Sequence, residues 1–140
     1  MADNILSVRG LTTEFSGGRG DVRVLDDLSF DVGRGRIVGL VGESGSGKSM
    51  TALSLMGLVP APQGRVTARS ILLDGTEISG LGAAGMRAIR GRDIAMVFQE
   101  PMTSLTPVRK VWEQVGEPLA IHHGLGRRAI RARVLEMFEM

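Results

Sequence analysis

The stretch Gly42-Glu43-Ser44-Gly45-Ser46-Gly47-Lys48-Ser49 decides how the rest of this chain is interpreted. It fits the pattern G-x-x-x-x-G-K-S/T of a phosphate-binding P-loop. The apolar run Ile37–Val41 leads into the loop and predicts a short strand. Behind the loop, apolar residues at i, i+3, i+4 and i+7 predict a helix: Ala52, Leu55, Met56 and Val59. Strand, glycine-rich loop and helix, in that order, are the context that a P-loop requires.

The residue types of this stretch suit a nucleoside triphosphate. Backbone N–H groups and the N-terminus of the following helix would attract the phosphates, and the glycines would let the backbone approach closely. Lys48 would reach the β- and γ-phosphates, and the Ser49 hydroxyl would bind Mg²⁺. The predicted nucleotide-binding residues of the loop are Gly42, Glu43, Ser44, Gly45, Ser46, Gly47, Lys48, Ser49 and Met50. The alternative is a glycine-rich turn that happens to contain a lysine.

Composition excludes several classes of protein. The 140 residues correspond to at most one ordinary domain, and a hydrophobic content of 43% can form a core. Because cysteine is absent, disulfides, thiolate zinc sites and a cysteine nucleophile are excluded. No apolar run approaches the roughly 20 residues that span a bilayer, so any membrane association is expected through a partner. The net charge of only +2 disfavours nucleic-acid binding.

The part of the chain up to residue 80 reads mainly as strands, which are predicted over residues 5–9, 22–25, 28–32 and 70–73. A glycine-rich flexible turn is predicted over residues 16–21. Asp74-Gly75 is a strong hairpin signal. Pro60 and Pro62 are expected to end the helix behind the P-loop.

The remainder reads mainly as helices. Residues 81–90 predict a short helix and residues 94–98 an apolar strand. A further helix is predicted over residues 108–121, where Pro118 would kink or split it. The last predicted helix, residues 127–140, carries one apolar face made of Ile130, Val134, Met137 and Phe138.

Two polar clusters in this part of the chain receive a structural interpretation. The first is basic and consists of Arg127, Arg128, Arg131 and Arg133; we interpret it as a solvated helix face rather than a nucleic-acid or lipid site. The second is the pair His122-His123. Adjacent histidines on a helix point apart, and no carboxylate or cysteine stands at ligand spacing, so we expect surface residues rather than metal ligands.

With these motifs in hand, the chain resembles the ATP-binding subunit of ABC transporters, and most closely the dipeptide/oligopeptide/nickel importer branch. The stretch Val41–Ser49 is similar in sequence to the P-loop of that branch. The stretch Ile94-Ala95-Met96-Val97-Phe98-Gln99-Glu100-Pro101-Met102-Thr103-Ser104-Leu105 is similar to its Q-loop segment. The resemblance implies an incomplete α/β fold, a P-loop NTPase core of the ABC ATPase type with an N-terminal antiparallel β-subdomain. Residues 1–100 would form the β-subdomain and core, and residues 101–140 the Q-loop and the start of a helical subdomain.

The resemblance also assigns roles to single residues. Gln99 would be the Q-loop glutamine, which contacts Mg²⁺ and the attacking water, so it would be a catalytic residue beside Lys48 and a metal-binding residue beside Ser49. From the residues alone, a polar residue at a strand end is the favoured interpretation of Gln99. Phe15 would stack on adenine, although a core residue of an early strand is the alternative. The implied ligands are ATP and Mg²⁺.

Other family motifs are not found in the sequence. A signature loop, a Walker B strand and a switch histidine are missing, and Thr106 stands where the branch has asparagine. Ile71-Leu72-Leu73-Asp74 is a superficial Walker B match that precedes Gly75, and we interpret it as part of a hairpin. The expectation is therefore the N-terminal part of an ATP-binding domain that binds nucleotide weakly by itself and hydrolyses it negligibly.

By resemblance, the parent function is ATP hydrolysis that drives import of peptides or a related solute. The implied location is the cytoplasmic face of the cell membrane, on transmembrane permease subunits, with a second ATP-binding subunit in a homo- or heterodimer. Two alternatives stay open: a nucleotide-binding fragment without hydrolytic activity, and another P-loop NTPase such as a GTPase or a small-molecule kinase. A GTPase should carry N-K-x-D, which is absent because the only lysines are Lys48 and Lys110.

Overall fold

The computed structural model describes residues 3–18, 20–100 and 104–140. By internal contacts the chain divides into two compact units, Met1–Arg87 and Ala88–Met140. Each unit is described by itself. The division predicted from the motifs lies later in the chain, between residues 100 and 101, because it followed the Q-loop segment rather than packing.

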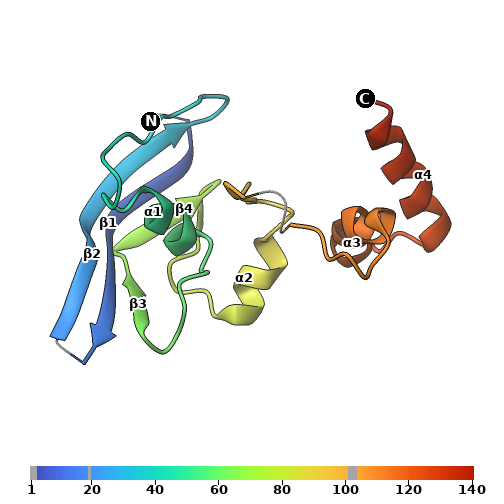
Figure 1. Ribbon diagram of the computed structural model, residues 1–140. Helices are drawn as coiled ribbons and strands as arrows, with labels where there is room; N and C mark the ends of the chain where they lie inside the picture. The colour runs from blue at the N-terminus through green and yellow to red at the C-terminus, as the bar shows by residue number, and fades with distance from the viewer. Residues whose placement is uncertain (1–2, 19, 101–103) are drawn as a thin grey trace. The chain divides into compact units, whose positions relative to one another are not determined.

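The first unit is built on a long antiparallel hairpin of β1 (Asn4–Gly17) and β2 (Gly20–Gly33), shown in blue in Figure 1. The strands predicted over residues 5–9, 22–25 and 28–32 are all parts of these two longer strands. The predicted break between the second and third is a local irregularity instead, where Asp27 takes a φ of 50° and the register shifts opposite residues 11–13. Such a bulge keeps one strand continuous while it bends.

β1 is the central strand of a five-stranded antiparallel sheet. Its other edge pairs with β3 (Gly64–Thr67) and with β4 (Ser70–Leu73). β4 turns into β5 (Thr76–Glu77) through Asp74 and Gly75, both at positive φ, as a two-residue hairpin turn requires. The predicted hairpin and the N-terminal antiparallel β-subdomain are thus confirmed, and Asp74 is a turn residue.

The β4–β5 hairpin is fastened by the carboxylate of Glu77. One oxygen accepts the Ile71 and Ser79 backbone N–H groups at 2.8 and 3.0 Å, and the other accepts the Ser70 hydroxyl. These hydrogen bonds, led by the one from Ser70, lower the pKa of Glu77 to about 2. Glu77 is therefore ionised at neutral pH, and its carboxylate stabilises the hairpin through these hydrogen bonds.

The core of the first unit lies between the sheet and α1 (Lys48–Leu55), which Figure 1 shows beside β1 and β4. Thr13 on β1 and Ser54 on α1 are both buried, and their hydroxyl oxygens lie 2.8 Å apart. The helix ends at Leu55, and Gly57 takes a left-handed φ of 59°. The expectation that Pro60 and Pro62 end it was wrong, because the glycine breaks the helix before either proline is reached.

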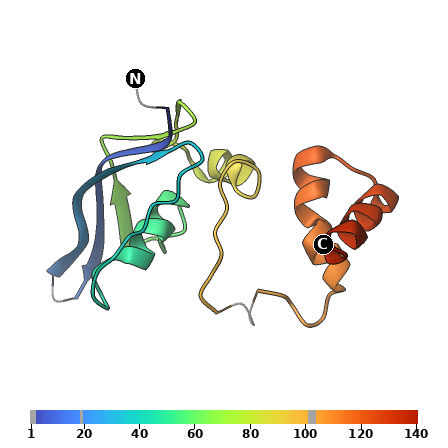
Figure 2. The ribbon, with the colours of Figure 1, turned by 90° about the horizontal axis from the view of Figure 1, so that it is seen from above.

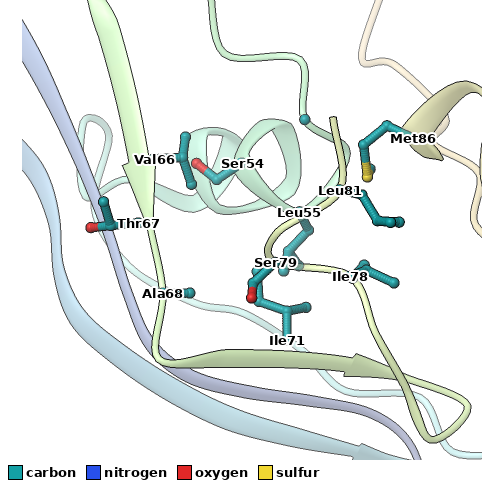
Figure 3. A pocket seen from close by; sticks show the side chains of 11 residues that line it. Ser54, Leu55, Val66, Thr67, Ala68, Ile71, Ile78, Ser79, Leu81 and Met86 are labelled. Carbon is teal, nitrogen blue, oxygen red and sulfur yellow. The ribbon is translucent and has the colours of Figure 1, made fainter. Parts of the chain in front are cut away.

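A hollow of about 180 Å³ lies beside α1, and Figure 3 shows side chains that line it, among them those of Leu55, Ile71 and Met86. Its walls are mainly apolar, with buried Ile71, Ile78 and Met86, and its polar groups are hydroxyls such as those of Ser54 and Ser79. None of its lining residues is charged. It is a packing gap of the core rather than an anion site.

Two predicted strands are not formed. Residues 36–43 have no strand pairing, and Ile94 makes only an isolated bridge with Arg90. Both runs are open to solvent: Val41 is 90% exposed and Val97 is 95% exposed. An apolar run of this kind forms a buried strand only when other strands pair with it on both sides, and none of the described residues does so.

Helices dominate the rest of the chain. α2 (Ala83–Ile89) confirms the helix predicted over residues 81–90 and crosses the division between the units. The second unit contains α3 (Val111–His123) and α4 (Arg127–Phe138), joined by the short loop seen in Figure 2. No helix formed by the described residues is both long enough and apolar enough to cross a bilayer.

α3 and α4 pack through a small residue. The prediction was that Pro118 would kink or split this helix. Pro118 lies inside an unbroken α3, which packs against α4, so the split does not occur and the kink stays a prediction. Ile130 and Val134 of α4 are buried. Met137 and Phe138, the other two residues of the predicted apolar face, are 47% and 58% exposed. The side chain of Ile130 sits on Gly116 of α3.

Gly116→Ala is expected to destabilise the helix pair. A Cβ at Gly116 would stand 2.2 Å from Ile130 Cγ2, so α4 would have to move away, and overpacking of this kind costs about 1–3 kcal/mol. Thermal unfolding followed by Trp112 fluorescence reports on α3 directly. Gly82→Ala is the matched control, since a Cβ there meets nothing within 4 Å. Equal melting temperatures for the two variants would contradict the close packing of Ile130 on Gly116.

Candidate nucleotide-binding site

The P-loop enters α1 through Gly47. This residue is the N-cap of α1 with a left-handed φ of 89°, and no side chain caps the helix. The first turn also contains no acidic residue, so the N–H groups at the helix start remain available and the positive end of the helix dipole is not offset. Beneath the loop lies β2: a Cβ at Gly47 would stand 2.7 Å from Leu25 Cδ2 and 3.2 Å from the Val24 carbonyl oxygen.

Lys48 closes the loop on itself. Its Nζ donates to the carbonyl oxygens of Gly42 at 2.7 Å and Glu43 at 2.6 Å, and it lies 3.3 Å from Ser46 Oγ. The ammonium group is therefore held at the inner side of the curve that the loop describes. It is the single cation among the loop residues 42–49, so an anion seated in this curve would meet it.

The glycines have separate roles in this curve. A Cβ at Gly42 would stand 2.5 Å from Ser46 Oγ and 3.2 Å from Ser46 Cβ, so a side chain at position 42 would force Ser46 to shift. Gly45 has a φ of 83°, a conformation that side chains rarely adopt, yet nothing lies within 4 Å of its Cβ position. One glycine is required for contact and the other for backbone conformation.

The loop borders a hollow of about 230 Å³ between β2 and the start of α1. Lys48 and Ser46 line it on the loop side, and Val24, Leu25 and Asp26 line it on the strand side. The carboxylate of Asp26 is paired with Arg23 at 2.8 Å. The hollow thus joins a cationic edge to an apolar strand surface.

Ser49 and Met50 occupy the first turn of α1, where Ser49 is exposed and Met50 is half-buried. A serine hydroxyl is the kind of hard oxygen that Mg²⁺ binds. The described residues contain no group of three or more His, Asp or Glu side chains that could hold a metal ion by themselves. A Mg²⁺ ion at Ser49 would therefore have to share its ligands with substrate phosphates, as Mg²⁺ commonly does.

Phe15 lies near the end of β1 and is half-buried. Its ring packs over β3: a Cβ at Gly64 would stand 3.0 Å from Phe15 Cε1. The ring thus has one face on the sheet, and both predictions for this residue, stacking on adenine and packing in the core, are compatible with that contact.

If Phe15 stacks on adenine, Phe15→Ala should weaken ATP binding by about 1 kcal/mol and leave pyrophosphate binding almost unchanged, because pyrophosphate has no base. Calorimetric titration with both ligands measures this difference. Phe30→Ala removes a half-buried ring from β2 and serves as the matched control. Equal losses for ATP and pyrophosphate would mean that Phe15 acts through the core.

Gln99 is exposed and belongs to the second unit, so its predicted role at the P-loop stays a prediction. Of the Q-loop segment, residues 101–103 lie outside the described part of the chain. The sequence analysis missed the supports of the loop, namely Leu25 beneath Gly47 and the Thr13–Ser54 contact that ties α1 to β1. No local pattern marks these residues, because each acts across a large sequence separation.

A glycine-rich loop that folds around a lysine at an uncapped helix start defines the P-loop class of nucleotide-binding proteins. The sequence pattern of the ABC transporter family matches residues 25–140, and the chain belongs to this family.

Several relatives show how far the likeness extends. A dipeptide transport ATP-binding protein of Bacillus subtilis is 41% identical over 138 residues, which cover 99% of this chain and 41% of the relative. A peptidoglycan transport ATP-binding protein of Agrobacterium fabrum is 44% identical over 133 residues, which cover 95% of this chain and 24% of that relative. The chain thus spans about two fifths or less of the length of these relatives.

A solved structure confirms the fold. The dimeric structure of a post-hydrolysis state of an ATP-binding cassette bound to ADP and Pi matches with a TM-score of 0.73 and 23% identity. The match covers 94% of this chain and 54% of that chain. The predicted fold class, a partial α/β domain of the ABC ATPase type, is therefore confirmed, although the strands predicted over residues 37–41 and 94–98 are not formed.

Proposed function

We propose that this chain supplies the P-loop and adenine-side part of an ABC importer's ATP-binding subunit and that its solutes are peptides. The observation that carries the proposal is the position of Lys48, whose ammonium group is held by the Gly42 and Glu43 carbonyl oxygens at the uncapped start of α1. Relatives named for dipeptide and peptide transport support the choice of solute.

The residues present would act mainly by binding and orienting ATP. Lys48 would exchange its carbonyl partners for phosphate oxygens, and the N–H groups of the loop and of α1 would bind the remaining oxygens. A bound Mg²⁺ would offset phosphate charge during transfer. Ser49 would be its protein ligand from α1, and we propose Gln99 as a second group that contacts the ion and positions the attacking water.

The proposed partners are transmembrane permease subunits and a second ATP-binding subunit, which would place the chain at the cytoplasmic face of the membrane. The dimeric state of the matched ATP-binding cassette and the transport names of the relatives support this assembly. Preference for adenine or guanine distinguishes this proposal from the alternative of a GTPase. The apolar face of Phe15 suits a purine but provides no hydrogen bonds that would select guanine.

Titration of the whole chain with Mg-ATP and Mg-GTP tests nucleotide binding. Saturable binding of Mg-ATP with one site per chain is expected, and a folded chain that binds neither nucleotide would refute the proposal. The solute is tested in a chimera in which residues 1–140 replace the matching stretch of the Bacillus subtilis dipeptide transport protein. Dipeptide uptake by cells that carry the chimera is expected, and loss of uptake with normal assembly would refute the peptide assignment.

In the same chimera, Gln99→Ala is expected to lower ATP hydrolysis and dipeptide uptake by roughly 10²-fold while ATP affinity changes little. The reason is that a group which positions water and metal acts after binding and therefore affects turnover. Gln63→Ala, which truncates another exposed glutamine, is the control. An affinity loss with normal turnover at saturating ATP would rule out this role for Gln99.

A further inference from the structure

A hollow of about 640 Å³ lies on the helix pair α3–α4. Four cationic side chains and two large apolar ones line it: Lys110, Arg127, Arg128 and Arg131, with Trp112 and Leu135. None of its lining residues is acidic. We refer to this hollow with its six named residues as the cationic hollow.

The cations of this hollow differ from other arginines of the same unit in their pairing. Arg92, Arg109 and Arg133 each form an ion pair, with Asp93, Glu117 and Glu136 respectively. Within the described part of the chain, Lys110, Arg128 and Arg131 form none. Three cations without an ion pair among the described residues therefore line one hollow.

Arg127 has a different position in the hollow. Its guanidinium lies 5.3 Å from the ring centroid of Trp112, and its Nη2 lies 3.6 Å from a carboxylate oxygen of Glu113. These contacts hold the indole in place as one wall. Arg127 is thus a support of the hollow, and the three unpaired cations are its binding groups.

The hollow also has an apolar wall, which is not a feature of a purely solvated helix face. Arg128, Arg131 and Leu135 follow one another at i, i+3 and i+7 along α4, on a different stripe from the buried Ile130 and Val134. Leu135 is 50% exposed although it lies beside Trp112 in the same hollow. Three cations above an apolar wall suit an anion that is attached to an apolar body.

We propose that the cationic hollow binds the phosphate group of an anionic phospholipid headgroup. Lys110, Arg128 and Arg131 provide the charge, and Trp112 and Leu135 meet the apolar part at the level where tryptophan is enriched in membrane-bound proteins. Membership in a transporter family makes a membrane surface the available source of such phosphates. The proposal is independent of nucleotide binding, so its test contains no nucleotide.

Sedimentation of the whole chain with vesicles measures the binding. Vesicles of phosphatidylcholine with 30% phosphatidylglycerol are compared with vesicles of phosphatidylcholine alone, and binding to the anionic vesicles only is expected. Arg128→Gln with Arg131→Gln should weaken that binding by about tenfold or more, since each basic residue near an anionic surface contributes substantially. Arg36→Gln with Arg87→Gln makes the same charge change at exposed arginines of the first unit. Equal losses for the two double variants would overturn the proposal.

Trp112 provides a second measurement that needs no variant, because it is the only tryptophan of the chain. Brominated acyl chains in the anionic vesicles should quench its fluorescence, and bound chain without quenching would overturn the proposal. Inorganic phosphate and glycerol phosphate are titrated in parallel as soluble ligands. A change in Trp112 emission with these ions but no vesicle binding would identify a free phosphate as the ligand instead. Tighter binding of a labelled oligonucleotide than of vesicles, lost in the Arg128/Arg131 variant, would assign a nucleic acid and also overturn it.

Discussion

Lys48→Ala is expected to weaken Mg-ATP binding by roughly ten- to a hundredfold. The side chain is the single cation among residues 42–49, and its Nζ lies 2.6–2.7 Å from the Gly42 and Glu43 carbonyl oxygens, whose place a phosphate would take. Charge-assisted hydrogen bonds of this kind contribute about 1.5–3 kcal/mol. Calorimetric titration of the folded variant measures the loss.

Two further variants separate the causes. Lys48→Arg keeps the charge but not the compact ammonium that fits between two carbonyl oxygens, so it should recover only part of the affinity. Arg87→Ala removes an exposed cation of the first unit and should leave the affinity unchanged. If Lys48→Ala bound Mg-ATP as tightly as the unaltered chain, the P-loop assignment would be wrong.

The loop and the hairpins could be predicted because their determinants are local. Gly42 and Lys48 form the closed loop with partners no more than six residues away, and Asp74-Gly75 forms its turn from two adjacent residues. The pattern of residue types was therefore sufficient to predict the loop and the turn.

The strands predicted over residues 37–41 and 94–98 failed for the opposite reason. Their apolar composition predicts burial, but a buried strand also needs neighbours that supply hydrogen bonds, and composition does not reveal which residues these are. Among the described residues none pairs with Val41 or Val97, and both are almost fully exposed. A local pattern can state that a segment is apolar without stating what covers it.

The arginine cluster illustrates a third limit. Four arginines on a predicted helix are most simply a solvated face, and the sequence alone gave no reason to separate them. The structure separates them, because Arg133 pairs with Glu136 whereas Arg128 and Arg131 face a hollow with Trp112, a residue from another helix. The combination of unpaired cations and an apolar wall arises only when α3 and α4 are packed together.

The second large effect is expected at Gly47, which supports the loop from below. In Gly47→Ala the new methyl group would stand 2.7 Å from Leu25 Cδ2 and 3.2 Å from the Val24 carbonyl oxygen, so the start of α1 would have to separate from β2. The left-handed φ of 89° adds about 1–2 kcal/mol, and the forced contact adds about 1–3 kcal/mol. The free energy of unfolding should therefore fall by about 2–5 kcal/mol, with Mg-ATP binding lost alongside it.

Gly45→Ala is the matched control for this change. Gly45 has nearly the same left-handed φ, 83°, but nothing lies within 4 Å of its Cβ position, so only the backbone term of about 1–2 kcal/mol applies. Chemical denaturation followed by circular dichroism compares the two variants, because the sheet of the first unit dominates the strand signal. We expect Gly47→Ala to be clearly the less stable variant. Equal stabilities would show that β2 does not support the loop, and that the need for glycine at position 47 comes from backbone conformation alone.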